Sequence, residues 1–176
     1  MGAGQDVGFS KAAVGDAMKL SAQEEYGLRC LLRVASAESG QSVTIPTIAA
    51  AEALSIAYVG KLMSVLRQAE FVASVRGQAG GYVLSRPPEE IAVADVLTLL
   101  GGRLFEPGFC DEFPGLERIC THSMDCSMRS LWRSIQQAID QSLEGITLKD
   151  LLRPESEVDA LVAPPPAAGR PRRAGG

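Results

Sequence analysis

Two β-prone runs separated by a glycine-rich turn follow three short helical segments, and this order constrains the fold more than any other feature of the chain. The runs cover residues 71–76 and 82–85, and the turn between them contains three glycines. Such a pair of runs forms a β-hairpin. A hairpin directly after a helix-turn-helix is a wing. The sequence therefore predicts a mainly α-helical fold, a winged helix-turn-helix, with one small β-hairpin.

The three helical segments each start with a recognisable signal. Ser21 stands three residues before Glu24, which is the spacing of a capping box. The second helix opens near Pro46, a residue favoured in the first helical turn. Ser55 can cap a third helix over residues 56–69, whose apolar residues recur at helical spacing.

The third helix and the wing are the candidate DNA-contacting elements, because a helix-turn-helix inserts the start of its last helix into the major groove. A tyrosine there can stack or hydrogen-bond, and a lysine can meet a phosphate or a guanine edge. An arginine on a wing suits a narrow minor groove, and glycines let the backbone approach a phosphate. Three helices and a hairpin also serve other purposes, so the pattern alone leaves DNA binding open. The candidates are Ser55, Ala57, Tyr58, Lys61, Arg76, Gly80 and Gly81.

The net charge of −4 gives nucleic-acid binding no general support, but the charge is unevenly distributed. Residues 18–90 carry seven basic and seven acidic side chains, whereas residues 91–163 carry six and twelve. The last 13 residues add three arginines. A neutral first half can bind DNA if its basic groups share one face.

The second half of the chain predicts a helix over residues 91–100, a loop that is rich in glycine, proline and acids, and a strong amphipathic helix over residues 127–143. The apolar stripe of the last helix can either pack within the chain or pair with a second copy. A small winged unit offers little surface to cover it, which favours a homodimer. The stripe contains Met128, Leu131, Trp132, Ile135 and Ile139.

The loop before that helix gathers three of the four cysteines. Cys110, Cys120 and Cys126 have the spacing Cys-x9-Cys-x5-Cys. Thiolates are soft ligands that suit iron–sulfur clusters, copper(I) and zinc. The spacing lacks the Cys-x2-Cys knuckle of many structural zinc sites. It leaves an iron–sulfur cluster, zinc and a metal-free thiol switch open, while Cys30 is predicted to be a buried helix thiol.

Four regions are predicted: a disordered extension (1–17), a DNA-binding domain (18–90), a region with a linker helix, the cysteine loop and the dimerisation helix (91–153), and a disordered tail (154–176). No apolar run approaches the ~20 residues of a membrane span. The N-terminus lacks the features of a secretion signal. With a single histidine and no visible catalytic set, the chain is expected to be a cytoplasmic protein that is not an enzyme and has no membrane partner.

The residues described above resemble the Rrf-type winged helix-turn-helix transcriptional regulators, the family that includes IscR, NsrR and RirA. The resemblance covers about residues 18–152, and its most specific part is the wing, Ser-Val-Arg-Gly-Gln-Ala-Gly-Gly-Tyr at 74–82. It implies a homodimer that binds a double-stranded DNA operator, with repression favoured over activation. It also implies a 2Fe-2S or 4Fe-4S cluster on Cys110, Cys120 and Cys126. Through this cluster the regulator would sense cluster status, iron, redox stress or nitric oxide.

The resemblance leaves the fourth ligand open. In the IscR type, a histidine follows the third cysteine by three residues, and here that position is Arg129. In some nitric-oxide-sensing relatives an acidic residue of the partner's first helix completes the site, and Glu25 occupies that position. His122 and Asp125 are further candidates, with Glu25 slightly favoured over His122. Zinc or a thiol switch is the alternative, and the winged unit argues against a cluster-carrying redox protein.

Overall fold

Three capped helices and a hairpin begin the fold. In the computed structural model, the described residues are 20–38, 41–77, 80–106, 108–112 and 126–162. The side chains of Ser21, Thr44 and Ser55 each accept the main-chain N–H three residues further on. Ser21 and Glu24 complete the predicted capping box. The predicted starts of all three helices are therefore confirmed. The elements are α1 (Ala22–Ala35), α2 (Ile45–Glu52), α3 (Ile56–Gln68), β1 (Val72–Val75) and β2 (Gly81–Leu84).

The hairpin is antiparallel, with Val72 opposite Leu84. Its other edge is covered by the segment before α2, where Val43 and Tyr82 exchange main-chain hydrogen bonds of 2.9 and 2.8 Å. Gly81 permits this approach, since a Cβ atom there would lie 2.7 Å from the Val43 carbonyl oxygen. The hairpin is thereby fastened to the helices rather than projecting alone.

The chain after the hairpin continues the same core. Short η1 (Pro88–Glu90) leads to α4 (Val93–Gly101), and η2 (Asp150–Leu152) returns beside them. Leu148 donates its main-chain N–H to Ile91 at 2.8 Å, and both side chains are fully buried. The predicted domain boundary at residue 90 therefore runs through one core, because Ile91, Val96, Leu100 and Leu148 pack with the residues of α1 and α3.

Helix α4 lies tightly on α1. A Cβ atom at Gly27 would lie 2.6 Å from Leu100 Cδ1, so the close approach of the two helices depends on the glycine. The Gln23 side chain also donates to the Leu100 carbonyl at 2.7 Å, near the end of α4. We call residues 20–101 and 146–152 the winged body, and residues 102–145 the α6 arm.

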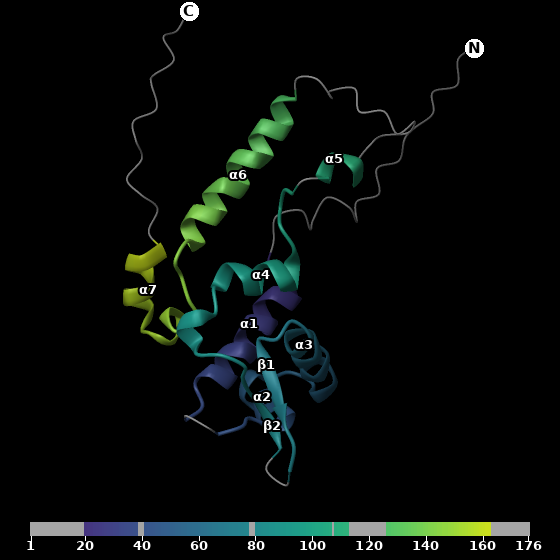
Figure 1. Ribbon diagram of the computed structural model, residues 1–176, viewed down its shortest axis with the longest axis vertical. Helices are drawn as coiled ribbons and strands as arrows, with labels where there is room; N and C mark the ends of the chain where they lie inside the picture. Colours follow the sequence, from purple (N-terminus) through teal and green to yellow (C-terminus); the bar gives the residue numbers. More distant parts are fainter. Residues whose placement is uncertain (1–19, 39–40, 78–79, 107, 113–125, 163–176) are drawn as a thin grey trace, which may run out of the picture.

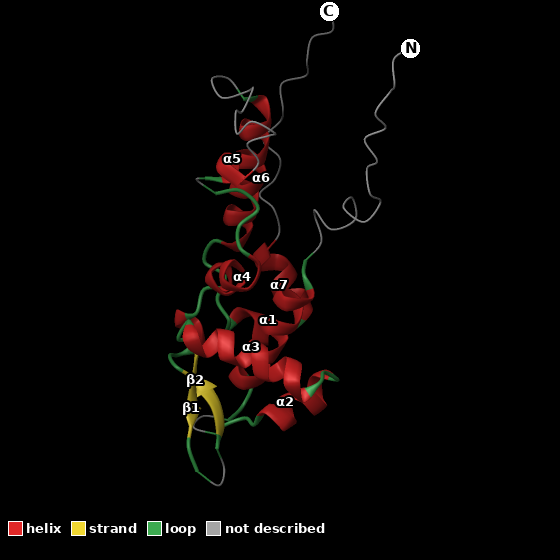
Figure 2. Ribbon diagram, turned by 90° about the vertical axis from the view of Figure 1, so that its right-hand side faces the viewer, coloured by secondary structure: helices red, strands yellow, loops and turns green. Residues whose placement is uncertain are grey.

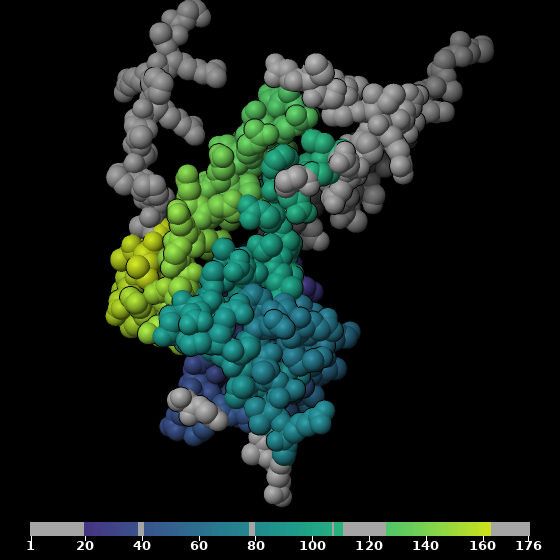
Figure 3. Space-filling view, viewed as in Figure 1, coloured from purple at the N-terminus to yellow at the C-terminus, as the bar shows by residue number. Residues whose placement is uncertain are grey.

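The α6 arm contains α5 (Phe109–Glu112) and α6 (Ser127–Leu143). Helix α6 extends away from the winged body, beyond α4, with α5 near its far half (Figures 1 and 2). In the space-filling view the green residues of α6 extend beyond the winged body, with teal residues of the preceding segment beside them (Figure 3). The sequence predicts only a loop between residues 101 and 126, but residues 109–112 of it are helical.

The predicted disordered tail is wrong at its start, because Glu155–Val162 form α7. The Pro154 carbonyl accepts the N–H groups of Glu157 and Val158 at 2.9 and 3.2 Å. Acidic residues in the first turn also suit the positive end of a helix dipole. Residues 1–17 and 163–176 lie outside the described residues. Within the described ranges no single helix is long and apolar enough to cross a membrane, and α2 with α3 meets that test only as a pair bent by 115°.

Candidate DNA-binding surface and cysteine site

The start of α3 combines capping residues with exposed ones. Ser55 is exposed, and its hydroxyl accepts the N–H of Tyr58 at 3.2 Å. The Tyr58 ring is half-buried and meets the Tyr26 ring edge-on, with 6.1 Å between centroids. Ala57 and Lys61 are exposed, and Lys61 forms no ion pair with any residue that the structure describes. Ser55 and Tyr58 thus have structural roles, while Ala57 and Lys61 lie open to a ligand.

Sequence reasoning missed Ile56, the first residue of α3. Its side chain is 60% exposed, the second most exposed among the large hydrophobic residues of the described chain. The signal was available in the sequence. Ile56 directly follows the predicted N-cap Ser55 and precedes Val59, the first buried residue of the helix, so its position lies outside the buried stripe.

The wing places Arg76 in the open. This residue directly follows β1, is exposed, and has no ion-pair partner within the described part of the chain. Gly80 donates its N–H to the Gly77 carbonyl at 2.9 Å, and Gly81 packs on Val43. The geometry of the wing itself accounts for these two predicted glycines. Contacts between them and DNA stay a prediction.

Two arginines of α1 are occupied by a carboxylate of α2. Glu52 accepts hydrogen bonds from Arg29 Nε at 2.8 Å and from an Arg33 terminal nitrogen at 3.0 Å. The hydrogen bond to Glu52 raises the pKa of Arg29. Arg29 also lies over the Tyr26 ring, with 5.6 Å to the centroid. These contacts hold α1 to α2 and make both arginines poor candidates for phosphate contacts.

Cys110 and Cys126 line the same small cavity, of about 220 Å³, in the α6 arm. Cys110 lies on α5, and Cys126 is the N-cap of α6, where its Sγ accepts the N–H of Arg129 at 3.3 Å. Both cysteines are half-buried. The predicted convergence of these two thiols is thus compatible with the structure. The other lining residues are Phe105, Phe109, Met128, Arg129 and Trp132.

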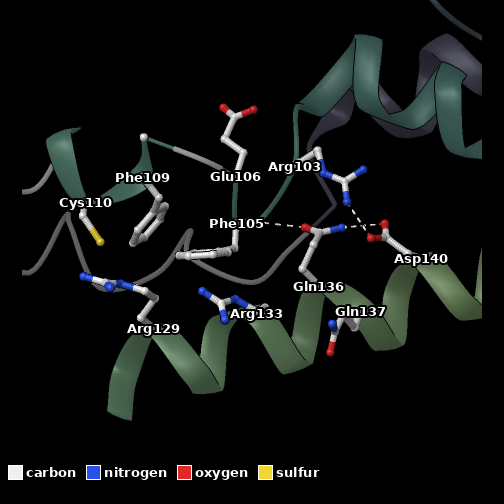
Figure 4. Close-up of a pocket in the computed structure, with 11 residues that line it drawn as sticks. Arg103, Phe105, Glu106, Phe109, Cys110, Arg129, Arg133, Gln136, Gln137 and Asp140 are labelled. Carbon is white, nitrogen blue, oxygen red and sulfur yellow. Dashed lines mark hydrogen bonds and ion pairs between the residues drawn. The ribbon is translucent and has the colours of Figure 1, made fainter. Parts of the chain in front are cut away.

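A larger pocket, of about 490 Å³, adjoins the cysteine cavity and shares Cys110 and Arg129 with it. Arg129 and Arg133 stand one turn apart on α6, below the segment that carries Cys110, and the Cys110 sulfur points toward Arg129 (Figure 4). The Phe105 and Phe109 rings lie 5.3 Å apart on the opposite wall. The pocket thus joins a thiol to positive charge.

A polar network ties the arm together, and no sequence pattern predicted it. Gln136, the one buried residue of α6, accepts the Phe105 N–H at 3.2 Å and donates to Asp140 at 2.9 Å. Asp140 also pairs with Arg103 at 2.5 Å (Figure 4). The segment at 103–105 therefore covers the polar face of α6.

The apolar face of α6 stays open as a result. Met128 and Leu131 are 52% and 54% exposed, Ile139 is also exposed, and Trp132 and Ile135 are half-buried. This is the stripe that the sequence predicts for dimerisation. In the chain alone nothing among the described residues covers it fully, so the face is suited to a partner.

The other predicted ligands are only partly described. Cys120, His122 and Asp125 lie outside the described residues. Glu25 lies on α1 with its side chain half-exposed, 4.0 Å from Arg29, and does not line the cysteine cavity of its own chain. Among the described residues, no three His, Cys, Asp or Glu side chains converge. Cys30 is fully buried, and burial raises its pKa to about 11, which makes it a poor ligand.

Comparison with known proteins agrees with this architecture. A family model described as "Rrf2: Iron-dependent Transcriptional regulator" matches residues 20–154. The protein rrf2 of Nitratidesulfovibrio vulgaris is 38% identical over 79% of this chain and 90% of its own length. The family consists of transcriptional regulators, which fits the prediction that the chain is not an enzyme.

Solved structures of other proteins share the fold, among them those of CymR and IscR. That of CymR, the global cysteine regulator of B. subtilis, has a TM-score of 0.62 and 30% identity over 76% of this chain and 95% of that chain. That of T. potens IscR has a TM-score of 0.60 and 31% identity over 77% and 86%. The mainly α-helical winged fold is therefore confirmed, and the chain belongs to the Rrf2 family of transcriptional regulators.

Proposed function

We propose that the chain is a homodimeric, cytoplasmic regulator that binds a double-stranded DNA operator and senses an iron–sulfur cluster. DNA binding follows from the family, and the start of α3 with Arg76 on the wing is the proposed contact surface. Repression is the favoured mode of action, and the signal is cluster status, iron, redox stress or nitric oxide. The observation that carries the proposal is the shared cavity of Cys110 and Cys126, directly at the start of a helix with an open apolar face.

The lining of the cavity fits a thiolate-ligated cluster. Two thiols offer soft ligands, and Arg129 supplies positive charge beside them. A bound cluster would supply a group that is lost or altered by oxidants, nitric oxide or iron shortage. Cys120 is the proposed third ligand. Glu25 of a second copy is the proposed fourth ligand, with His122 and Asp125 as alternatives.

Cys126 couples the cavity to α6. Its sulfur caps the helix by accepting the Arg129 N–H. Any group that ligates this sulfur competes for the same lone pairs and acts on the first turn of α6. That turn carries Met128, at one end of the proposed dimer face.

The proposed dimer connects this change to DNA. If two α6 helices pair, their packing sets the separation of the two recognition helices, and operator half-sites have a fixed spacing along the duplex. A change at Cys126 would then alter operator affinity. Coupling of this kind amounts to about 1–3 kcal/mol.

A zinc site or a metal-free thiol switch is the second candidate. It is favoured by the similarity to CymR of Staphylococcus aureus, of which one solved structure is described as the oxidized form, and by the half-buried state of both thiols. Such a switch would use the same cap and the same helix. It differs from the first candidate only in what Cys110 and Cys126 bind.

Anaerobic purification of the full chain, with iron, acid-labile sulfide and zinc determinations, separates the two candidates. The first requires a coloured protein with iron and sulfide, and the loss of both in a Cys110→Ala/Cys120→Ala/Cys126→Ala variant, while Cys30→Ala keeps them as the matched control. Operator affinity is then compared between the wild type and the triple variant. A colourless protein that resists cluster reconstitution would refute the iron–sulfur candidate, and equal affinity would refute the switch.

A further inference from the structure

We infer that Ile56 reads thymine, through contact with the C5-methyl group in the major groove. The inference rests on the proposed DNA binding and adds to it the class of base that the recognition helix selects. It starts from the exposure of Ile56, which is 60%. Ile56 does not belong to the core cluster or to the partly buried residues packed against it.

Among the residues that the structure describes, this exposed side chain has no packing partner in the core. An apolar staple at a helix start joins the residue before the N-cap to the fourth helical residue. Those positions are Leu54 and Val59, which pack in or against the core. Ile56 lies between them in sequence, but it neither takes part in the staple nor packs against the core. Ser55 caps the helix, and Ile56 is therefore the first residue of α3.

The neighbours of Ile56 decide what it could recognise. Beside Ile56, the exposed residues at the start of α3 are Ser55, Ala57 and Lys61, while Tyr58 and Gly60 are half-buried. None of them carries the amide or guanidinium group that makes bidentate contacts with adenine or guanine. Lys61 can donate to a base edge or a phosphate, whereas the Ser55 hydroxyl caps the helix and the Tyr58 ring packs edge-on against Tyr26. The tip of α3 is therefore mainly apolar.

The major-groove edges of the base pairs offer one apolar group, the thymine methyl. Gly60 has no side chain, so the helix projects less on the side next to Ile56. The space there is open, since a Cβ atom at Gly60 would have Ile45 Cδ1, at 4.0 Å, as its nearest neighbour. A helix with small residues can come close to the base edges. An isoleucine at its tip then reaches a methyl group, where a polar side chain would need a hydrogen-bond partner.

The expected effect is the loss of one methyl contact. Removing the methyl of the contacted thymine weakens binding by about three- to fivefold, the ratio that corresponds to burial of one such group. In Ile56→Ala the same removal has little effect, since the contact is already gone. Ile56→Val keeps the branched Cβ and retains part of the effect.

The test begins with selection of bound duplexes from a random-sequence pool, using the full chain both as purified without oxygen and after iron removal with a chelator. Each thymine of the selected duplex is then replaced in turn by uracil, which lacks only the methyl. Affinities are measured for the wild type, Ile56→Ala and Ile56→Val. Leu161→Ala, at an exposed leucine of α7, is the matched control and should keep the wild-type pattern.

The outcomes separate the two levels of the argument. If no sequence is enriched and binding is only nonspecific, the proposed operator binding fails. If a sequence is enriched but no uracil weakens wild-type binding, or the penalty is unchanged in Ile56→Ala, the reading of thymine by Ile56 is wrong while operator binding stands. A penalty at one thymine in each half-site that disappears in Ile56→Ala supports the inference.

Discussion

The winged body buries its apolar side chains, whereas the α6 arm leaves apolar side chains of α6 exposed. In the winged body, leucine, isoleucine and valine residues from α1, α3 and α4 are buried in one core, joined by Ile91 and Leu148. In the arm, the buried residue of α6 is Gln136, and Leu131 faces outward. The winged body buries its own hydrophobic side chains in this core. The arm leaves apolar side chains of α6 exposed among the described residues, and these form the face of the proposed dimer.

The largest expected effect tests this contrast at the open face. Leu131→Glu should leave the winged body folded but weaken the proposed dimer at least about 100-fold, because a charge enters an apolar interface in both copies. Sedimentation velocity over a range of protein concentrations measures the change. Gln141→Glu places the same charge on another, exposed side of α6 and should leave the dimer intact. A wild-type protein that is already monomeric at micromolar concentration would contradict the dimer.

A matched pair of leucines compares the two regions directly. Leu66→Ala in the core should lower the free energy of unfolding by about 2–5 kcal/mol, because it removes a fully buried side chain and leaves a cavity. Leu131→Ala should lower it far less when the protein is dilute, and the effect should grow with protein concentration. Urea unfolding at two concentrations gives both numbers. Equal losses at low concentration would mean that α6 is packed as tightly as the core.

The winged body was largely predictable, because its signals are local. Ser21, Thr44 and Ser55 mark helix starts through side chains that act within one turn. The hairpin follows from two β-prone runs and the glycines between them. These features need no knowledge of distant residues, so the order of elements up to residue 85 could be derived.

Long-range backbone pairing was not predictable. The contact between Val43 and Tyr82 and the contact between Ile91 and Leu148 join segments far apart in the sequence, and no local pattern specifies that they pair. For this reason the sequence did not reveal that residues on both sides of the predicted boundary at residue 90 pack in one core. The start of the tail was misjudged on composition, although Pro154 followed by acids is itself a helix-start signal.

The candidate site also has a part that could be predicted from local sequence and a part that could not. The cysteines and the apolar stripe could be recognised as residue types at suggestive spacings. Their surroundings, such as the Gln136–Asp140–Arg103 network, depend on how the segment at 103–105 lies on α6. Glu25 as a fourth ligand depends on a second copy, and so stays a prediction.

A third prediction uses the buried thiol of the winged body. Cys30 has a folded-state pKa of about 11, raised by burial, against an ordinary value of 9.0. The unfolded chain therefore loses its proton first, and the stabilising effect of the protonated thiol is complete below pH 9 and is lost as the pH rises toward 11. The loss is on the order of 2 kcal/mol.

The difference between the wild type and Cys30→Ala isolates this effect from other groups that titrate at high pH. Their difference in unfolding free energy should be constant below pH 9 and shrink above it. In parallel, native protein treated with iodoacetamide should be modified at Cys110 and Cys126, the half-buried thiols of the arm, before Cys30. Rapid modification of Cys30 in the folded protein would contradict the burial.

The smallest expected effect compares two carboxylates with similar partners. Glu52 in the body and Asp140 in the arm each pair with arginine, but the side chain of Glu52 is 9% exposed and that of Asp140 is 43% exposed. Glu52→Gln should cost about 1 kcal/mol, because the partners Arg29 and Arg33 are partly exposed and regain water. Asp140→Asn should cost at most about 0.5 kcal/mol, as solvent screens the exposed pair. Urea unfolding of each variant in low and high salt makes the comparison. If Asp140→Asn proves as costly as Glu52→Gln, the polar face of α6 is held as firmly as the body, and only the apolar face of the arm depends on a partner.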